Sequence, residues 1–200
     1  MTKNFNDLRL NKSYSDVTII AGEKEFPANK SVLSVRSPVF ERMFSENFRE
    51  HEENIVRITD IDADIMEALL DFIYTAEVAN LKELAPDLLL AADKYGMSSL
   101  YTVCVNNIIE NLSLDNVVQM FILADTYKID RLKEKTMTFI NSNGQKVFAT
   151  EDWKKLVKPN QALMIELYEN MIENHHCSTS PNIVNYVLGV MDDYDYDLDD

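Results

Sequence analysis

Residues 16–40 read DVTIIAGEKEFPANKSVLSVRSPVF, and this stretch decides the fold because it changes from strand to helix patterning. The run VTII at residues 17–20 is rich in β-branched residues, which favour strands. Gly22 marks a turn, and a second short extended piece, KEF, follows at residues 24–26. The sequence therefore predicts a small β-hairpin.

Helical patterning begins after the hairpin. Residues 30–35 form one short segment, and Ser37 followed by Pro38 predicts the N-cap and the first position of a second helix. Residues 55–58, IVRI, predict a third strand of the same short sheet. The apolar face of the second helix consists of Val39, Phe40, Met43 and Phe44.

The chain from Asp62 onward repeats apolar residues at helical spacing. Pro86 is expected to begin the next helix and Gly96 to end it. Ser113 is expected to cap a later helix. We therefore expect an α+β chain that is predominantly helical. Beyond Gly96, the predicted helices cover residues 98–110, 113–124, 129–140 and 159–173.

Composition and charge restrict the class of protein. The 200 residues are 46% hydrophobic, which is enough for one or two cores. Cys104 and Cys177 do not form a disulfide framework, no secretory signal is apparent at the start, and the longest apolar stretch, residues 117–124, is too short to span a membrane. These features predict an intracellular protein of the cytoplasm, the nucleus or both.

The acidic balance argues against nucleic acid as a direct ligand. The chain has 34 acidic and 19 basic residues, so its formal net charge of −15 repels phosphate backbones. Part of the excess lies at residues 192–200, DDYDYDLDD. Because this tail repels itself and is poor in aliphatic residues, we expect it to be disordered and solubilising.

Enzyme chemistry lacks its usual motifs. No phosphate-binding loop, dinucleotide fingerprint or zinc-hydrolase helix occurs, so we predict no catalysis, no cofactor and no metal site. His175, His176 and Cys177 form one ligand-like cluster, but a connector before Pro181 is the alternative that we favour. Cys104 is expected in the core, and Trp153 is expected to anchor a helix start.

Seven motifs, in matching order and spacing, resemble the BTB/POZ family. The last three resemble its speckle-type POZ subgroup in particular, including an abbreviated BACK region, and the resemblance covers about residues 5–173. It implies a short three-stranded sheet flanked by helical hairpins, followed by BACK-like helices. The motifs lie at residues 16–19, 26–30, 32–40, 72–75, 88–95, 111–116 and 122–125. The expected domains are 1–112 (BTB/POZ), 113–176 (cullin-contacting helices and BACK region) and 177–200 (C-terminal segment).

Homodimerisation is the first function that the resemblance implies. Phe5, Leu8 and Leu10 lie in a polar segment too short to form its own core, so they need either a partner chain or their own domain as a surface. We favour the partner chain. Asp16 and Lys30 match the charged pair that lines the dimer groove of many family members.

Recruitment of cullin-3, a ubiquitin-ligase scaffold, is the second implied function. The family uses a hydrophobic-x-Glu motif in the loop that follows residues 43–44, and here that loop carries Phe48 and Glu50. An exposed phenylalanine can fill a partner pocket, while a carboxylate can accept orienting hydrogen bonds. In the alternative, Phe48 folds back on its own domain and Glu50 is a solvated charge.

The leading prediction is a dimeric cullin-3 adaptor in a ubiquitin ligase. The sequence also departs from the family pattern at Asn29, where a histidine is common. We expect neither a MATH domain before the BTB region nor a kelch or zinc-finger array after it. One alternative is therefore a self-associating protein that pairs with MATH-BTB relatives or interferes with them, and another is a corepressor scaffold that uses the dimer groove.

Overall fold

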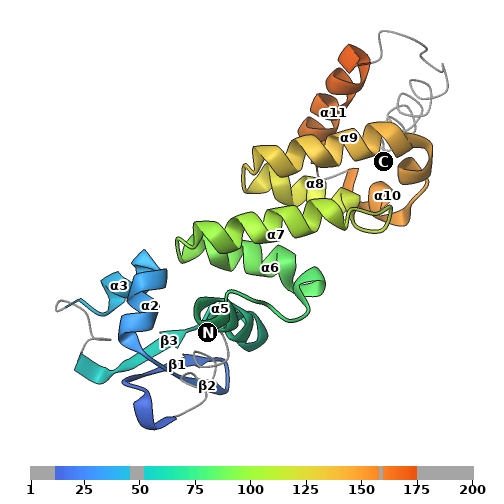
Figure 1. Cartoon of the computed structure of the whole chain (residues 1–200). Helices are drawn as coiled ribbons and strands as arrows, with labels where there is room; N and C mark the ends of the chain where they lie inside the picture. Colours follow the sequence, from blue (N-terminus) through green and yellow to red (C-terminus); the bar gives the residue numbers. More distant parts are fainter. Residues whose placement is uncertain (1–11, 46–51, 158–159, 175–200) are drawn as a thin grey trace, which may run out of the picture. The chain divides into compact units, whose positions relative to one another are not determined.

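The computed structural model describes residues 12–45, 52–157 and 160–174. By its internal contacts the chain forms two compact units, Met1–Asn111 and Leu112–Asp200 (Figure 1). Each unit has its own set of helices, and the described strands all belong to the first unit.

A three-stranded sheet with the order β2-β1-β3 forms one part of the first unit. Strands β1 (Val17–Ala21) and β2 (Lys24–Ala28) pair antiparallel, and β3 (Ile55–Ile58) runs parallel to β1. Gly22 lies in the turn between β1 and β2, where its φ is +57°. The predicted hairpin and third strand are therefore confirmed, and edge strand β2 tolerates Pro27 because no strand of the described residues pairs with its outer side.

The helices of the first unit lie before, between and after the strands in the sequence. Apolar residues at helical spacing explain α5, whose predicted stripe of Ile65, Met66, Leu69, Leu70 and Ile73 is buried. The elements are η1 (Lys12–Tyr14), α2 (Lys30–Arg36), α3 (Pro38–Met43), α5 (Ala63–Thr75), α6 (Leu81–Lys94) and α7 (Ser98–Glu110).

The junction between α3 and α6 rests on Ser37. Its hydroxyl oxygen accepts a hydrogen bond from the Phe40 amide, which confirms the predicted N-cap, and the hydroxyl donates to the Tyr95 carbonyl at 2.7 Å. The rings of Phe40 and Tyr95 lie 4.7 Å apart, between centroids. Gly96 ends α6 in the left-handed region, as predicted, and the Met97 amide bonds back to the Ala92 carbonyl.

The predicted start of α6 at Pro86 is wrong, because the helix begins at Leu81 and Pro86 lies inside it. Asn80 adopts left-handed φ, and its carbonyl accepts the first hydrogen bonds of the helix. Proline removes one backbone hydrogen bond, but burial of Leu88 and Leu89 holds the segment helical.

The second unit contains four described helices around one apolar cluster. Ser113 does not cap α8 directly, since that helix begins four residues later, and α9 continues well beyond the predicted end at Ile140, with a non-helical residue at Asn143. The helices are α8 (Val117–Thr126), α9 (Asp130–Phe148), α10 (Glu151–Val157) and α11 (Gln161–Asn174). The cluster includes Val117, Val118, Phe121, Ile140, Val147, Phe148, Trp153, Leu163, Met164 and Leu167.

Trp153 anchors the start of α10 as the sequence predicts. Its amide donates to the Thr150 hydroxyl at 3.2 Å, and its ring lies 4.6 Å from that of Phe148. The cluster of His175, His176 and Cys177 and the acidic tail lie outside the described residues.

Candidate protein-binding surface

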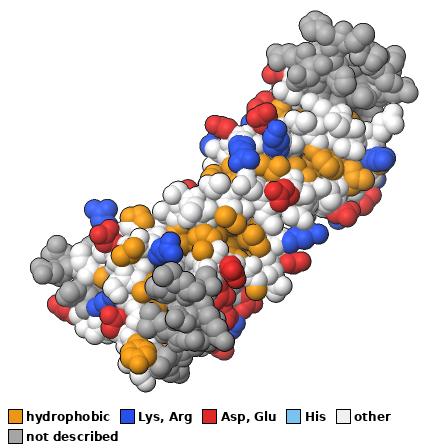
Figure 2. All heavy atoms as spheres, in the orientation of Figure 1, with side chains coloured by type: hydrophobic (Ala, Val, Ile, Leu, Met, Phe, Trp, Pro, Cys, Tyr) orange, Lys and Arg blue, Asp and Glu red, His pale blue; other side chains and the backbone are white. Residues whose placement is uncertain are grey.

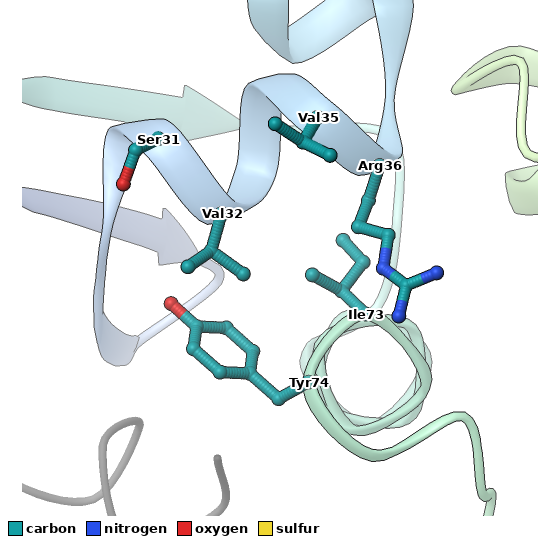
Figure 3. Close-up of a pocket in the computed structure, with 6 residues that line it drawn as sticks. All are labelled: Ser31, Val32, Val35, Arg36, Ile73 and Tyr74. Carbon is teal, nitrogen blue, oxygen red and sulfur yellow. The ribbon is translucent and has the colours of Figure 1, made fainter.

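A groove of about 440 Å³ lies between α2 and α5 in the first unit (Figure 3). Its lining is largely apolar, and Val35 is 86% exposed. Arg36 supplies the charged side chain of the lining. The lining residues are Ser31, Val32, Val35, Arg36, Ile73 and Tyr74.

Local sequence explains why α2 presents apolar side chains outward. Val32 and Val35 stand three positions apart and share one face, whereas Leu33 points to the core and is fully buried. A short helix with three apolar residues at positions 32, 33 and 35 cannot bury all of them on one side. That excess is the sequence signal for an exposed apolar surface on α2.

Asp16 and Lys30 are brought together at the start of α2. The Asp16 carboxylate accepts a 2.7 Å hydrogen bond from the Lys30 backbone amide, and so satisfies a free N–H of the helix. The Lys30 ammonium group lies 5.6 Å from the centroid of the Phe44 ring. The predicted pair is therefore in contact, and within the single chain Asp16 is exposed and Lys30 is half-buried.

Asn29 connects the groove to the beginning of the described chain. Its Nδ2 donates to the Tyr14 carbonyl at 2.5 Å, and its backbone amide donates to the Tyr74 hydroxyl at 2.9 Å. The Tyr74 hydroxyl in turn donates to Asn29 Oδ1 at 3.1 Å. Asn29 itself is only 8% exposed.

The other predicted contact residues lie outside the described residues. The structure therefore places none of them relative to the groove. They are the dimer residues Phe5, Leu8 and Leu10 and the cullin-binding residues Phe48 and Glu50.

The second unit carries a polar connection among three helices. Lys133 of α9 donates to Asp125 of α8 at 2.8 Å and to Glu166 of α11 at 2.7 Å. The hydrogen bond from Lys133 lowers the pKa of Asp125 below its usual value. Exposed apolar side chains of this unit include Tyr127 and Ile165.

Two titratable side chains of the first unit, Cys104 and Tyr95, are buried. Cys104 is fully buried, and burial raises the pKa of its thiol to about 12. Burial likewise raises the pKa of Tyr95.

No group of three or more histidine, cysteine or carboxylate side chains is placed to hold a metal ion in the described parts of the chain. Within the same parts, no helix is long and apolar enough to cross a bilayer.

Comparison with known proteins identifies the family. The BTB/POZ domain model matches residues 5–112, and the model of the BPM/SPOP BACK domain matches residues 116–168. The chain therefore belongs to the BTB/POZ family, and its second unit contains a BACK domain of the BPM/SPOP type. The predicted resemblance and fold class are confirmed. Proteins of this family are generally non-enzymatic adaptors or scaffolds, and neither model describes a catalytic domain.

Two mouse (Mus musculus) proteins are similar over most of the chain. TD and POZ domain-containing protein 3 is 32% identical over 186 residues, which cover 92% of this chain and 51% of that protein. TD and POZ domain-containing protein 5 is 34% identical over 166 residues, covering 82% and 49%. The chain thus spans about half the length of these relatives. A solved structure, the BTB domain of zebrafish PATZ1, is 29% identical with a TM-score of 0.48, covering 56% of this chain and 90% of that one.

Proposed function

We propose that this chain is a dimeric, non-catalytic adaptor that binds cullin-3 and supports ubiquitination by a cullin-RING ubiquitin ligase. The observation that carries the proposal is the tandem of a BTB/POZ match at residues 5–112 and a BPM/SPOP-type BACK match at residues 116–168. The first would supply self-association and the cullin contact, and the second would extend the contact surface. A dimer offers two sites, so avidity would strengthen binding to a clustered substrate.

The α2–α5 groove supports self-association with a second copy as its occupant. Val35 is 86% exposed beside a largely apolar lining, and burying a valine side chain contributes about 1.5–2 kcal/mol. Twofold symmetry would use each such contact twice. The space-filling view shows apolar side chains at the surface of the first unit (Figure 2). We assign the partner's Phe5, Leu8 and Leu10 to this surface, since they are apolar residues in a polar segment.

The cullin contact is assigned to Phe48 and Glu50. Helix α3 ends at Met43, and the Ser45 hydroxyl donates to the Arg42 carbonyl at the end of the helix. Phe48 therefore follows the helix by a few residues, in the position that the family motif occupies.

Titration of the purified chain with the cullin-3 N-terminal domain tests the adaptor proposal. Phe48→Ala and Glu50→Lys should each weaken binding at least tenfold, because they remove an apolar anchor and an orienting carboxylate. Glu53→Lys is the matched control, since it makes the same charge change at a nearby exposed residue. Failure of the intact dimer to bind cullin-3 would contradict the adaptor role and favour a protein that pairs with MATH-BTB relatives.

Mass measurement across a dilution series tests the dimer separately. Val35→Glu should raise the dimer dissociation constant more than tenfold, because a charge would enter the groove surface. Val103→Glu, at a 37% exposed position of α7, is the control for placing a carboxylate on a helix. Equal dissociation constants for Val35→Glu and the unaltered chain would exclude the groove as the interface.

A further inference from the structure

Asn29 occupies the N-cap position of α2 but does not use its side chain to cap that helix. Asparagine at an N-cap ordinarily accepts a hydrogen bond from the first helical turn. Here Asp16 accepts from the first amide of the helix instead, at Lys30. The Asn29 carboxamide is thereby available for two other elements.

The two ends of this carboxamide have different partners. Nδ2 donates to the Tyr14 carbonyl, and Oδ1 accepts from the Tyr74 hydroxyl. A primary amide has donors on nitrogen and an acceptor on oxygen, so this pair of partners defines its orientation. The Asn29 backbone amide adds a second hydrogen bond to the Tyr74 hydroxyl, which holds the phenol ring in place.

These two partners belong to different parts of the proposed self-association surface. Tyr14 ends η1, is 64% exposed, and lies four residues after Leu10 in the sequence. Tyr74 lines the α2–α5 groove, where Figure 3 shows its hydroxyl directed toward the N-terminal half of α2 near Val32. One nearly buried amide thus joins the exposed end of η1 with a wall of the groove.

We propose that Asn29 is a positioning residue for self-association, because its carboxamide holds the backbone of the exposed Tyr14 beside Tyr74 of the groove. The inference rests on the proposed dimer and specifies how it is organised. Asn29 is 8% exposed, so it acts through Tyr14 and Tyr74 and not through direct contact with a partner. Fixing Tyr14 and Tyr74 in the free chain lowers the ordering cost of association.

Three substitutions distinguish the roles of the two hydrogen bonds that the Asn29 carboxamide makes. Asn29→Asp keeps an acceptor for Tyr74 but replaces the donor to Tyr14 by a carboxylate oxygen that faces a carbonyl. Asn29→Ala removes both ends. Tyr74→Phe removes the hydroxyl but keeps the donor toward Tyr14 and the ring in the groove. Ser37→Ala is the control, since Ser37 is a fully buried polar residue of the same unit whose hydrogen bonds go to Phe40 and Tyr95.

Each variant of the 200-residue chain is measured for its dimer dissociation constant and, at concentrations below that constant, for its thermal midpoint. Asn29→Asp and Asn29→Ala should raise the dissociation constant at least tenfold, and Tyr74→Phe should raise it less. Ser37→Ala should lower the thermal midpoint by as much as the Asn29 variants do. Its dimer dissociation constant should stay within threefold of that of the unaltered chain.

Two results would overturn the inference, and they are distinguishable. If the unaltered chain dimerises and both Asn29 variants dimerise within threefold of it, Asn29 has a structural role alone and the proposed dimer stands. If the unaltered chain is monomeric at all concentrations, the dimer and the positioning role fail together.

Discussion

The Asp16 carboxylate caps helix α2 from fourteen positions upstream, because it accepts a 2.7 Å hydrogen bond from the Lys30 amide. Asp16→Ala should lower the free energy of unfolding by about 1 kcal/mol, the usual cost of losing a helix cap. Asp16→Asn retains an acceptor oxygen and should cost less. Urea unfolding of the three proteins measures the difference, and equal loss in both variants would show that the carboxylate charge matters more than the hydrogen bond.

Gly96 is expected to tolerate no side chain. Its φ is +65°, and an added Cβ would lie 2.7 Å from Cγ of Pro38. Gly96→Ala should therefore cost about 2–4 kcal/mol, from left-handed backbone strain and overpacking together. Gly22→Ala is the matched control, since φ is +57° there but nothing lies within 4 Å of an added Cβ. It should cost about 1 kcal/mol, and chemical denaturation should separate the two.

Ala76 ends α5 with φ +59°, in the left-handed region where a Cβ is unfavourable. Ala76→Gly should stabilise the protein by about 0.5–1 kcal/mol, because relief of strain exceeds the added flexibility of the unfolded chain. Ala149, at the end of α9, has φ −83°, so Ala149→Gly should destabilise by a similar amount. Opposite shifts of the thermal midpoint are expected, and shifts of the same sign would refute the strain argument.

Cys104 should be inert in the folded protein. Burial raises the pKa of its thiol from 9.0 to about 12, so the thiolate is scarce near neutral pH. In a Cys177→Ser background, a thiol reagent should react with Cys104 only as fast as the chain unfolds. Because the folded pKa exceeds the unfolded one, this group's contribution to stability is present below pH 9 and declines as pH rises toward 12.

Lys133 should support the second unit at neutral pH and lose part of that role in acid. Its hydrogen bond depresses the pKa of Asp125, so the associated stability is present above the ordinary value of 3.8 and is lost as pH falls through the folded value. Lys133→Met should reduce stability at neutral pH and flatten its acid dependence. Unfolding measured between pH 3 and pH 7, roughly the span of a carboxylate titration, tests this.

Local features were predictable from the sequence where residues close together in the chain determine the structure. Ser37 followed by Pro38 indicated a capped helix, and residues 98–110 indicated α7 with the bounds that the structure has. Pro86 misled because a proline inside a helix resembles one at its start, whereas the structure has a helical turn before it that buries Ala85.

The candidate surface was predictable only in part. The sequence indicated Asp16 and Lys30 through a family motif, but not that the carboxylate would bond to the backbone amide. Val35 was not recognised, because an apolar residue on a short helix looks the same whether it faces the core or the solvent.

The sequence by itself determined the hairpin, most helix positions and the family, because β-branched runs, turn glycines, caps and apolar periodicity act within a few residues. Only the tertiary structure decided that Asn29 joins Tyr14 to Tyr74 and that Gly96 adjoins Pro38. Such contacts link residues far apart in the chain. Their existence depends on how packed elements meet, which no local pattern specifies.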